Sequence, residues 1–370
     1  MGAITRAFAN NILTGGKFDA TDMTGALPAA TIGNPSMANI TDIPALTAVT
    51  TVTSDPPSPD AGQIWYNSSQ NMLKAYVLGP GSWASGGSIN QARSQGGNNA
   101  SGGSASIGLV SGGNKYSPGA SYNNTEIYNG TAWTEVNNLN TTRGYSTGGG
   151  TPSGALVVSG ILAGQAAGMA NVESWDGTNW TETTDVNAQR VQAAGAGTQT
   201  ATLFFGGEGS PFADNKNKTE LWNGTTWTEV NNLNEGRSQP GGGGISTSAI
   251  SVNGYNGSAK SNDAETWDGT SWTEISNTNV TAEGRNGAAH SNTQAIVFGG
   301  RAPAYLATTE QWDGSTWTEV ADLATARYNG TSSGSGTSAW LAGGYPGSNP
   351  QPAITEEWTQ ANISKRLGVS

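Results

Sequence analysis

Six arginines recur along the chain at nearly even intervals, and each precedes a recurring glutamate. A guanidinium group binds a carboxylate or a phosphate through two parallel hydrogen bonds, so the six together could hold sialic acid or phosphate. Because each repeat also has its own glutamate, we predict structural pairing between strands or loops instead. The arginines are Arg93, Arg143, Arg190, Arg237, Arg285 and Arg327, and the glutamates are Glu126, Glu173, Glu220, Glu265, Glu310 and Glu356 or Glu357.

The other ionisable residues offer little for catalysis. A glycosidase needs paired carboxylates in a pocket, but the repeat accounts for most acidic residues here. His290 is the only histidine and there is no cysteine, so a transition-metal site lacks its usual ligands. We therefore predict no catalytic residue, no cofactor, no metal site and no enzymatic activity, with a glycan-active enzyme as the minor alternative. A second glutamate series is expected on a solvated strand face: Glu135, Glu182, Glu229, Glu274 and Glu319.

The least repetitive stretches carry aromatic residues that could contact a partner. In a regular frame, variable loops are the natural place for recognition. Aromatic rings beside Asn and Ser suit sugar faces or an adaptable protein contact. The alternative is that these rings only pin their own loops. The candidate glycan or protein contacts are Tyr116, Phe212, Tyr255, Tyr305 and Tyr345.

The elements that must position these residues are repeated hairpins. The stretch ETWDGTSWTEI at residues 265–275 has four close relatives, each with an aromatic, Asn-Gly or Asp-Gly, and a Trp. Such dipeptides are strong signals for a tight hairpin turn. The turn glycines are spaced by 47, 47, 45 and 45 residues, and a period in the forties with four short strands indicates a β-propeller. These glycines are Gly130, Gly177, Gly224, Gly269 and Gly314.

The order of the markers is more specific than their period. It runs Arg, strand, apolar run ending in Gly-Gly, variable loop, Glu-x-aromatic, turn and Trp. This order resembles the kelch repeat over residues 83–359, although the fourth copy has Asn253-Gly254 in place of Gly-Gly. The resemblance implies an all-β, kelch-like β-propeller, in which one Trp per repeat packs between sheets. These residues are Trp83, Trp133, Trp180, Trp227, Trp272 and Trp317.

The two chain ends are predicted to share one blade. The last copy reaches Trp358 and then lacks its turn and second Trp. Trp83 lies ten residues before Arg93, the offset that separates Trp133 from Arg143, so the Trp83 strand is expected to complete the last blade. We favour six blades in residues 83–370. The possible hairpin at residues 63–76, within a linker at 61–82, leaves seven open.

Residues 1–60 differ in composition from the repeats. They mix small residues, Pro and short apolar steps, which do not make a self-sufficient core. The phrases MTGALP at residues 23–28 and NITDIP at 39–44 resemble shaft segments of bacteriophage tail fibres. The resemblance implies an extended segment that anchors the chain to other virion proteins or to its own copies, with a trimer as the favoured oligomer.

The charge of the chain excludes some partners. A net charge of −11 argues against nucleic acid and anionic lipid, and the chain has no apolar run of about 20 residues for membrane insertion. The sequence therefore predicts a bacteriophage virion protein, a tail or neck fibre whose propeller recognises a glycan or protein of the host surface. A capsid decoration protein without a receptor role fits the same sequence.

Overall fold

The computed structural model describes residues 49–60, 62–96, 104–115, 119–165, 167–209 and 216–367, which form strands, turns and loops with no helix. Accordingly, these residues contain no helix that could cross a bilayer. The chain divides into two compact units. The repeat unit is Gly81–Thr359, and the terminal unit combines Met1–Pro80 with Gln360–Ser370. Most of the predicted anchoring segment, residues 1–48, lies outside the described residues.

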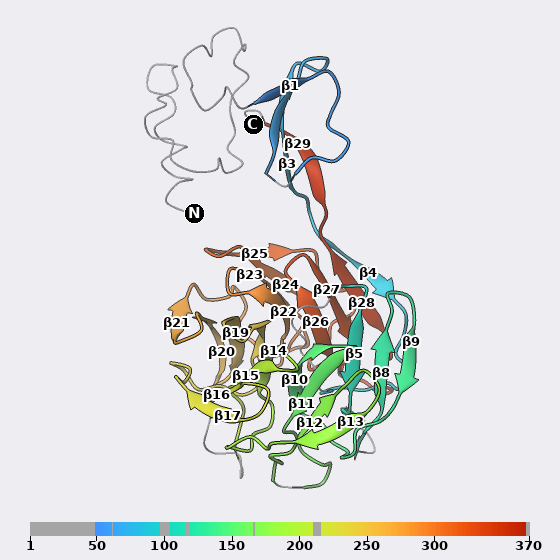
Figure 1. The fold of residues 1–370 in the computed structure, drawn as a ribbon, viewed down its shortest axis with the longest axis vertical. Helices are drawn as coiled ribbons and strands as arrows, with labels where there is room; N and C mark the ends of the chain where they lie inside the picture. The colour runs from blue at the N-terminus through green and yellow to red at the C-terminus, as the bar shows by residue number, and fades with distance from the viewer. Residues whose placement is uncertain are drawn as a thin grey trace. The chain divides into compact units, whose positions relative to one another are not determined.

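The repeat unit is built of small antiparallel sheets, numbered here 1 to 6 in chain order (Figure 1). Sheets 2 to 6 have four strands, and sheet 1 has three among the described residues. This all-β arrangement is compatible with a propeller. Sheet 1 contains β5 (Gly108–Ser111), β8 (Thr125–Tyr128) and β9 (Trp133–Val136); sheet 2 contains β10 (Thr147–Thr151), β11 (Gly154–Val158), β12 (Val172–Trp175) and β13 (Trp180–Thr183); sheet 3 contains β14 (Ala194–Thr198), β15 (Ala201–Phe205), β16 (Thr219–Trp222) and β17 (Trp227–Val230).

The remaining sheets repeat this pattern with longer strands in sheet 4. A short ladder, β6 (Asn114–Lys115) with β7 (Ala120–Ser121), lies in the loop after β5. Sheet 4 contains β18 (Gly241–Ile245), β19 (Ser248–Tyr255), β20 (Lys260–Trp267) and β21 (Trp272–Ile275); sheet 5 contains β22 (Asn286–Ser291), β23 (Gln294–Phe298), β24 (Thr309–Trp312) and β25 (Trp317–Val320); sheet 6 contains β26 (Thr331–Ser335), β27 (Ser338–Ala342), β28 (Thr355–Thr359) and β4 (Ser82–Gly86).

The first strands are rich in glycine because first strands of neighbouring sheets approach closely. A Cβ on Gly195 of β14 would lie 2.4 Å from the carbonyl oxygen of Gly148 in β10. A Cβ on Gly149 would lie 2.8 Å from the carbonyl oxygen of Gly197. Side chains at these positions would separate the two sheets, which gives the high glycine content a packing role.

Strands three and four form the predicted hairpin. In sheet 3, Trp222 lies opposite Trp227, with ring centroids 5.2 Å apart. The side-chain oxygen of Asn223 accepts hydrogen bonds from the N–H groups of the two residues after the glycine. Gly224 has φ of +93°, a conformation that glycine adopts without a steric penalty. The Asn-Gly turn therefore fixes the register that brings the two Trp rings together.

Six buried apolar clusters hold the sheets against one another. The cluster between sheets 2 and 3 joins Leu156 and Val158 to Phe204 and Trp227. Corresponding clusters join sheet 1 to 2, 3 to 4, 4 to 5 and 5 to 6. The sixth cluster contains residues of both sheet 6 and sheet 1. Each sheet therefore packs against two others, and its second strand is buried on both faces.

Sheet 6 combines the two ends of the repeat unit, as the sequence predicts. Its fourth strand is β4, which pairs antiparallel with β28 and places Trp83 opposite Trp358. The Trp83 ring lies 4.8 Å from that of Phe298 in sheet 5, and its Nε1 donates to the hydroxyl of Thr309 at 3.2 Å.

The terminal unit has its own four-stranded sheet, in the order β1 (Thr50–Val52), β2 (Ile64–Asn67), β3 (Met72–Leu78) and β29 (Asn362–Arg366). The predicted hairpin at residues 63–76 is present as β2 and β3. The expectation that the repeat fold runs to residue 370 differs from the structure, because β29 pairs with the free edge of β3.

Asp55 accepts hydrogen bonds from Lys74, Asn67 and Trp65, which lower the pKa of its carboxyl group to about 2.

Candidate recognition face

The repeated arginines and glutamates form six ion pairs, one in each sheet of the repeat unit. Their N–O distances lie between 2.5 and 3.1 Å, and no side chain of the twelve is more than 4% exposed. Of the two alternatives at the last glutamate, Glu356 forms the pair. Glu357 instead accepts a hydrogen bond from the Tyr128 hydroxyl of sheet 1. The arginines are therefore held inside the sheets and do not form an open anion site.

Each pair lies in a network that ties successive sheets together. In sheet 2, Arg143 donates to Glu173 and to three backbone carbonyl oxygens. The other oxygen of Glu173 accepts from the backbone and side-chain N–H groups of Asn140, at 2.7 and 3.0 Å. The Asn140 amide also donates to the carbonyl of Trp180 at 2.9 Å. Since Asn140 follows sheet 1, the network binds that sheet to sheet 2.

The burial of these groups lowers the pKa of the arginines. Burial lowers the pKa of Arg190 and of Arg327 to about 10, against the attraction of their glutamates. Both remain protonated at neutral pH. A buried charge that has lost its partner destabilises the folded state. Removal of either the arginine or the glutamate of a pair is therefore expected to lower the stability of the repeat unit.

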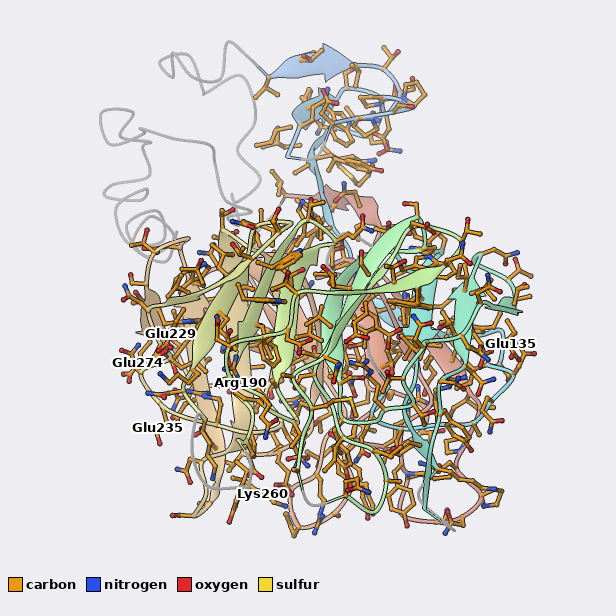
Figure 2. All side chains as sticks on the ribbon, turned by 60° about the horizontal axis from the view of Figure 1, so that its bottom comes forward. Glu135, Arg190, Glu229, Glu235, Lys260 and Glu274 are labelled. Carbon is orange, nitrogen blue, oxygen red and sulfur yellow. The ribbon has the colours of Figure 1, made fainter. Side chains whose placement is uncertain are left out.

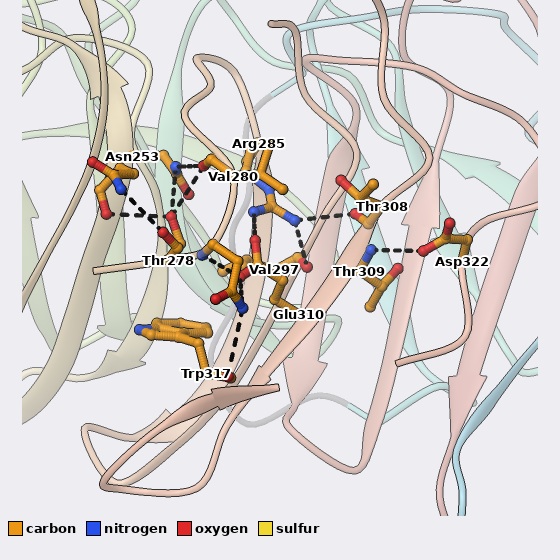
Figure 3. Close-up of polar contacts among 12 residues, drawn as sticks. Asn253, Thr278, Val280, Arg285, Val297, Thr308, Thr309, Glu310, Trp317 and Asp322 are labelled. Atoms are coloured by element: carbon orange, nitrogen blue, oxygen red, sulfur yellow. Dashed lines mark hydrogen bonds and ion pairs between the residues drawn. The ribbon is translucent and has the colours of Figure 1, made fainter. Parts of the chain in front are cut away.

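Sheet 5 keeps the network despite an insertion. Arg285 follows Trp272 by thirteen residues, where other repeats have ten. It still donates to Glu310 at 2.5 Å and to the carbonyls of Val297 and Thr308 (Figure 3).

Asn253 replaces the first glycine of the fourth repeat without loss of the local geometry. Its φ is +57°, a left-handed conformation that Asn tolerates better than most residues. Its side-chain amide donates to Ser261, Thr278 and Val280, two of which are labelled with it in Figure 3. The side chain thus supplies contacts that a glycine cannot make.

Sheet 6 has the weakest network. Arg327 and Glu356 are 3.1 Å apart, and the Nε and Nη1 atoms of Arg327 have no hydrogen-bond partner. Ala324 stands where the other five sheets have Asn90, Asn140, Asn187, Asn234 or Asn279. Its N–H still donates to Glu356 at 2.7 Å, but the two hydrogen bonds of the asparagine side chain are missing.

We therefore predict that Ala324→Asn stabilises the repeat unit. The new amide can donate to Glu356 and to the carbonyl of Trp83, as Asn140 does to Glu173 and Trp180. A net gain of about 1 kcal/mol in the free energy of unfolding is expected, measurable by chemical denaturation. Asn234→Ala, the reverse change in sheet 4, should lower the stability by a similar amount. A destabilising effect of Ala324→Asn would contradict this account.

The Gly-Gly loops and the arginine segments lie at the same end of the sheets, which we call the loop face. The N–H of Gly113 donates to the carbonyl of Arg143, and Gly207 donates likewise to Arg237. In the last sheet, Gly344 donates to the carbonyl of Arg93, at 2.9 Å. Gly300 donates likewise to Arg327, so the loops of sheets 1, 3, 5 and 6 are fixed to the start of the next sheet, whereas Gly254 of sheet 4 donates to the carbonyl of Ala282.

Six residues near the centre of the loop face form a ring of backbone hydrogen bonds. Each N–H donates to the carbonyl of the previous member, and Gln95 donates to Asn329 at 2.7 Å, which completes the ring. All six have φ between +53° and +61°, although only one is glycine. The ring leaves amide side chains at its rim, beside a polar cavity of about 60 Å³. The members are Gln95, Tyr145, Gln192, Gln239, Gly284 and Asn329.

The structure brings two of the predicted aromatic contacts together. Tyr305 lies 5.7 Å from Tyr345 and 5.4 Å from Tyr328, between ring centroids. Tyr328 and Tyr345 are each only 8% exposed, whereas Tyr305 is half-buried. The rings of Tyr345 and Tyr328 thus pack against each other and against Tyr305, which comes from the loop of sheet 5. Of the three, Tyr305 offers the largest exposed surface.

The other predicted contacts, Tyr255, Tyr116 and Phe212, belong to the loops of other repeats than the three tyrosines of this cluster. Tyr255 is half-buried at the end of β19, and Lys216 lies over its ring at 5.7 Å from the centroid. Its hydroxyl donates to the carbonyl of Gly257 at 3.1 Å. Tyr116 and Phe212 lie outside the described residues.

Charge is distributed unevenly over the repeat unit. Beyond the six paired arginines, its only cationic side chains follow the second strand of a sheet: Lys115, Lys216, Lys218, Lys260 and Arg301. The second glutamate series is exposed as expected, and Figure 2 shows Glu135, Glu229 and Glu274 at the outer rim. His290 is exposed on β22.

Three features of this face were missed in the sequence. The asparagines that bind each glutamate lie three residues before the arginine in four of the repeats, so their spacing was a usable signal. The residues of the hydrogen-bonded ring follow the arginine by two positions in five repeats. Because they differ in residue type, a search for a repeated residue does not find them. Tyr328 directly follows Arg327 and carries no pattern of its own.

A comparison of the chain with protein-family models and with curated proteins finds no match. The kelch resemblance therefore depends on the order of the repeat markers.

Proposed function

We propose that the repeat unit is a closed, kelch-like β-propeller of six blades. Three observations support closure: the ring of hydrogen bonds returns from Asn329 to Gln95, an apolar cluster joins sheet 6 to sheet 1, and β4 completes sheet 6. The hairpin that left seven blades open pairs with β29 in the terminal unit, which favours six.

We further propose that this propeller is a display module of a bacteriophage virion protein, a tail or neck fibre that contacts the host surface through the loop face. The observation that carries the proposal is the burial of all six arginine–glutamate pairs. The repeated charges are used to hold the sheets together, so variation among repeats is left to the loops. The resemblance of residues 23–28 and 39–44 to fibre shafts supports a place on a virion.

The expected ligand is a neutral glycan or a protein. Tyr255 and Tyr305 present partly exposed rings. The rim of Gln95, Gln192, Gln239 and Asn329 carries amide groups, of which Gln239 already donates to Gln192 and accepts from Asn329. Aromatic faces with neighbouring amides bind sugar rings and peptides alike. With a net charge of −11, a strongly anionic polymer would be repelled overall.

The test is adsorption of particles that carry altered protein. Tyr255→Ser with Tyr305→Ser should slow adsorption to host cells at least tenfold, the effect of about 1.4 kcal/mol of binding free energy. Tyr345 is left intact, because its ring is buried. Ile107→Ser is the matched control, since Ile107 is 41% exposed immediately before β5 of sheet 1, whereas the candidate loop follows that strand.

Two outcomes would count against the proposal. If the doubly altered protein melts normally and adsorption is unchanged, the loop face is not the receptor-binding surface, and a capsid decoration role replaces it. If antibodies against the repeat unit find no copies on purified particles, the virion assignment itself is wrong.

A further inference from the structure

The loop face contains a second cavity, at the junction of sheets 6 and 1. Its volume is about 550 Å³, within the size range of sites for small ligands. Gln351 in its wall is only 7% exposed and donates to the hydroxyl of Ser94 at 2.8 Å, which ties the loop of sheet 6 to the start of sheet 1. We call this cavity the junction cleft; it is lined by Gln91, Ala92, Lys115, Asn349, Pro350 and Gln351.

Side chains of adjacent loops contact one another at three other junctions of the loop face. Between sheets 3 and 4, Glu208 accepts a hydrogen bond from Ser238 at 2.9 Å and lies 3.8 Å from the amine of Lys216. Between sheets 4 and 5, Glu283 lies 3.5 Å from the amine of Lys260. Between sheets 5 and 6, the three tyrosine rings pack together. The cations at these junctions therefore already have a carboxylate of the chain itself.

Lys115 is the cationic group of the junction cleft, and its charge is not matched in this way. Every other lysine and arginine of the repeat unit forms an ion pair, whereas Lys115 forms none with the described residues. The junction cleft thus lacks the carboxylate that Glu208 and Glu283 supply elsewhere. A bound anionic group would provide it, through a hydrogen bond about twice as strong as one between neutral groups.

The rest of the junction cleft combines neutral polar groups with apolar surface. The amide of Gln91 donates to the Tyr122 hydroxyl at 3.0 Å. This bond orients the side chain and leaves its carbonyl oxygen without a partner among the described residues. The exposed amide of Asn349 is likewise unpartnered by them. Such amides can donate to and accept from hydroxyl groups, and the ring of Pro350 adds an apolar surface.

We propose that the junction cleft binds a sugar residue that carries one carboxylate, such as a hexuronic acid. The carboxylate pairs with Lys115, the hydroxyl groups bond to the amides of Gln91 and Asn349, and the sugar ring lies against Pro350. A single carboxylate differs from the strongly anionic polymer that the net charge of −11 would repel. The inference goes beyond the proposed receptor role, because it depends on neither Tyr255 nor Tyr305 and concerns the purified protein.

The test is titration of the full-length protein with glucuronate, glucose and acetate, followed by ligand-detected NMR. Glucuronate has a carboxylate where glucose has a hydroxymethyl group, and acetate has the carboxylate without the sugar ring. We expect glucuronate to bind about tenfold more tightly than glucose, the effect of one hydrogen bond to a charged group. Acetate should also bind at least tenfold more weakly, since it cannot reach the amides.

Three variants locate the binding site. Lys115→Gln should weaken glucuronate binding about tenfold and leave the affinity for glucose unchanged. Lys218→Gln is the matched control, because this lysine of the sheet 3 loop lies outside the junction cleft and pairs with Glu229; it should leave glucuronate binding unchanged. Asn349→Ala removes no charge and should weaken glucuronate binding about fivefold. None of these changes removes a buried side chain, so all three variants should fold.

Several results would overturn the proposal. Absence of glucuronate binding, or equal affinities for glucuronate and glucose, would show that the junction cleft does not select a carboxylate. Equal losses in Lys115→Gln and Lys218→Gln would place the bound glucuronate elsewhere. Tighter binding of the tripeptide Gly-Glu-Gly than of glucuronate would make the junction cleft a site for an acidic peptide and not for a sugar.

Discussion

Glu173→Ala is expected to lower the free energy of unfolding of the repeat unit by about 3–5 kcal/mol, the typical cost of removing one partner from a buried ion pair. The change leaves Arg143 charged and enclosed, with both side chains at most 1% exposed in the native protein. It also removes the acceptor for Asn140 and for the N–H of Thr141. Denaturant unfolding followed by tryptophan fluorescence gives the measurement.

Glu182→Ala is the matched control for this prediction. Glu182 lies directly opposite Glu173 on β13 but is exposed, so its loss should change stability by no more than about 0.5 kcal/mol. Replacing Arg143 and Glu173 together by Met should recover part of the loss, since no unpaired charge remains. If Glu173→Ala and Glu182→Ala lower the free energy of unfolding equally, burial of the ion pair does not explain the loss of stability.

Trp83→Ala should lower the free energy of unfolding of the repeat unit by about 3 kcal/mol. This value is in the lower part of the range for removing a large core side chain, because Trp83 is only half-buried. The change removes the contacts with Phe298 and Trp358 and the hydrogen bond to Thr309. Both ends of the repeat unit meet in sheet 6, so they should loosen together. Limited proteolysis should then cut near Trp358 before any other site.

Trp272→Ala separates this effect from general loss of stability. Trp272 has the equivalent position in sheet 4, and its Nε1 donates to Thr219 at 3.1 Å. All four strands of sheet 4 are consecutive in the chain, so this variant should be destabilised without early cleavage near Trp358. If both variants are cut first at the same place, sheet 6 is not the weak point of the unit.

The repeat made much of this fold predictable. Asn-Gly turns fix their hairpins locally, and the ten-residue offset between Trp83 and Arg93 was enough to place β4 in sheet 6. The pairing of arginine with glutamate also followed from their equal numbers. These inferences succeeded because the same local structure occurs in every repeat, so the sequence of each repeat supports the structure inferred for the others.

Features without such repetition were hidden. The pairing of β29 with β3 joins residues nearly 290 positions apart, and neither strand resembles a repeat. The aromatic residues were chosen by composition, but exposure depends on packing between loops, which leaves Tyr345 mostly buried and Tyr305 half-buried. The left-handed backbone of Gln95 and Gln239 is imposed by the ring of hydrogen bonds and not by the preference of Gln.

The pairing of β4 with β28 also means that the chain passes between the two units twice, once near Pro80 and once near Gln360. A protease that cuts either crossing leaves the other intact, and the strand pairs on both sides keep the severed end in place. A force that pulls the two units apart is likewise divided over two segments of the polypeptide chain, which leave sheet 6 at the same end. A repeat unit attached in this way is expected to remain joined to the terminal unit after a single cut at either crossing.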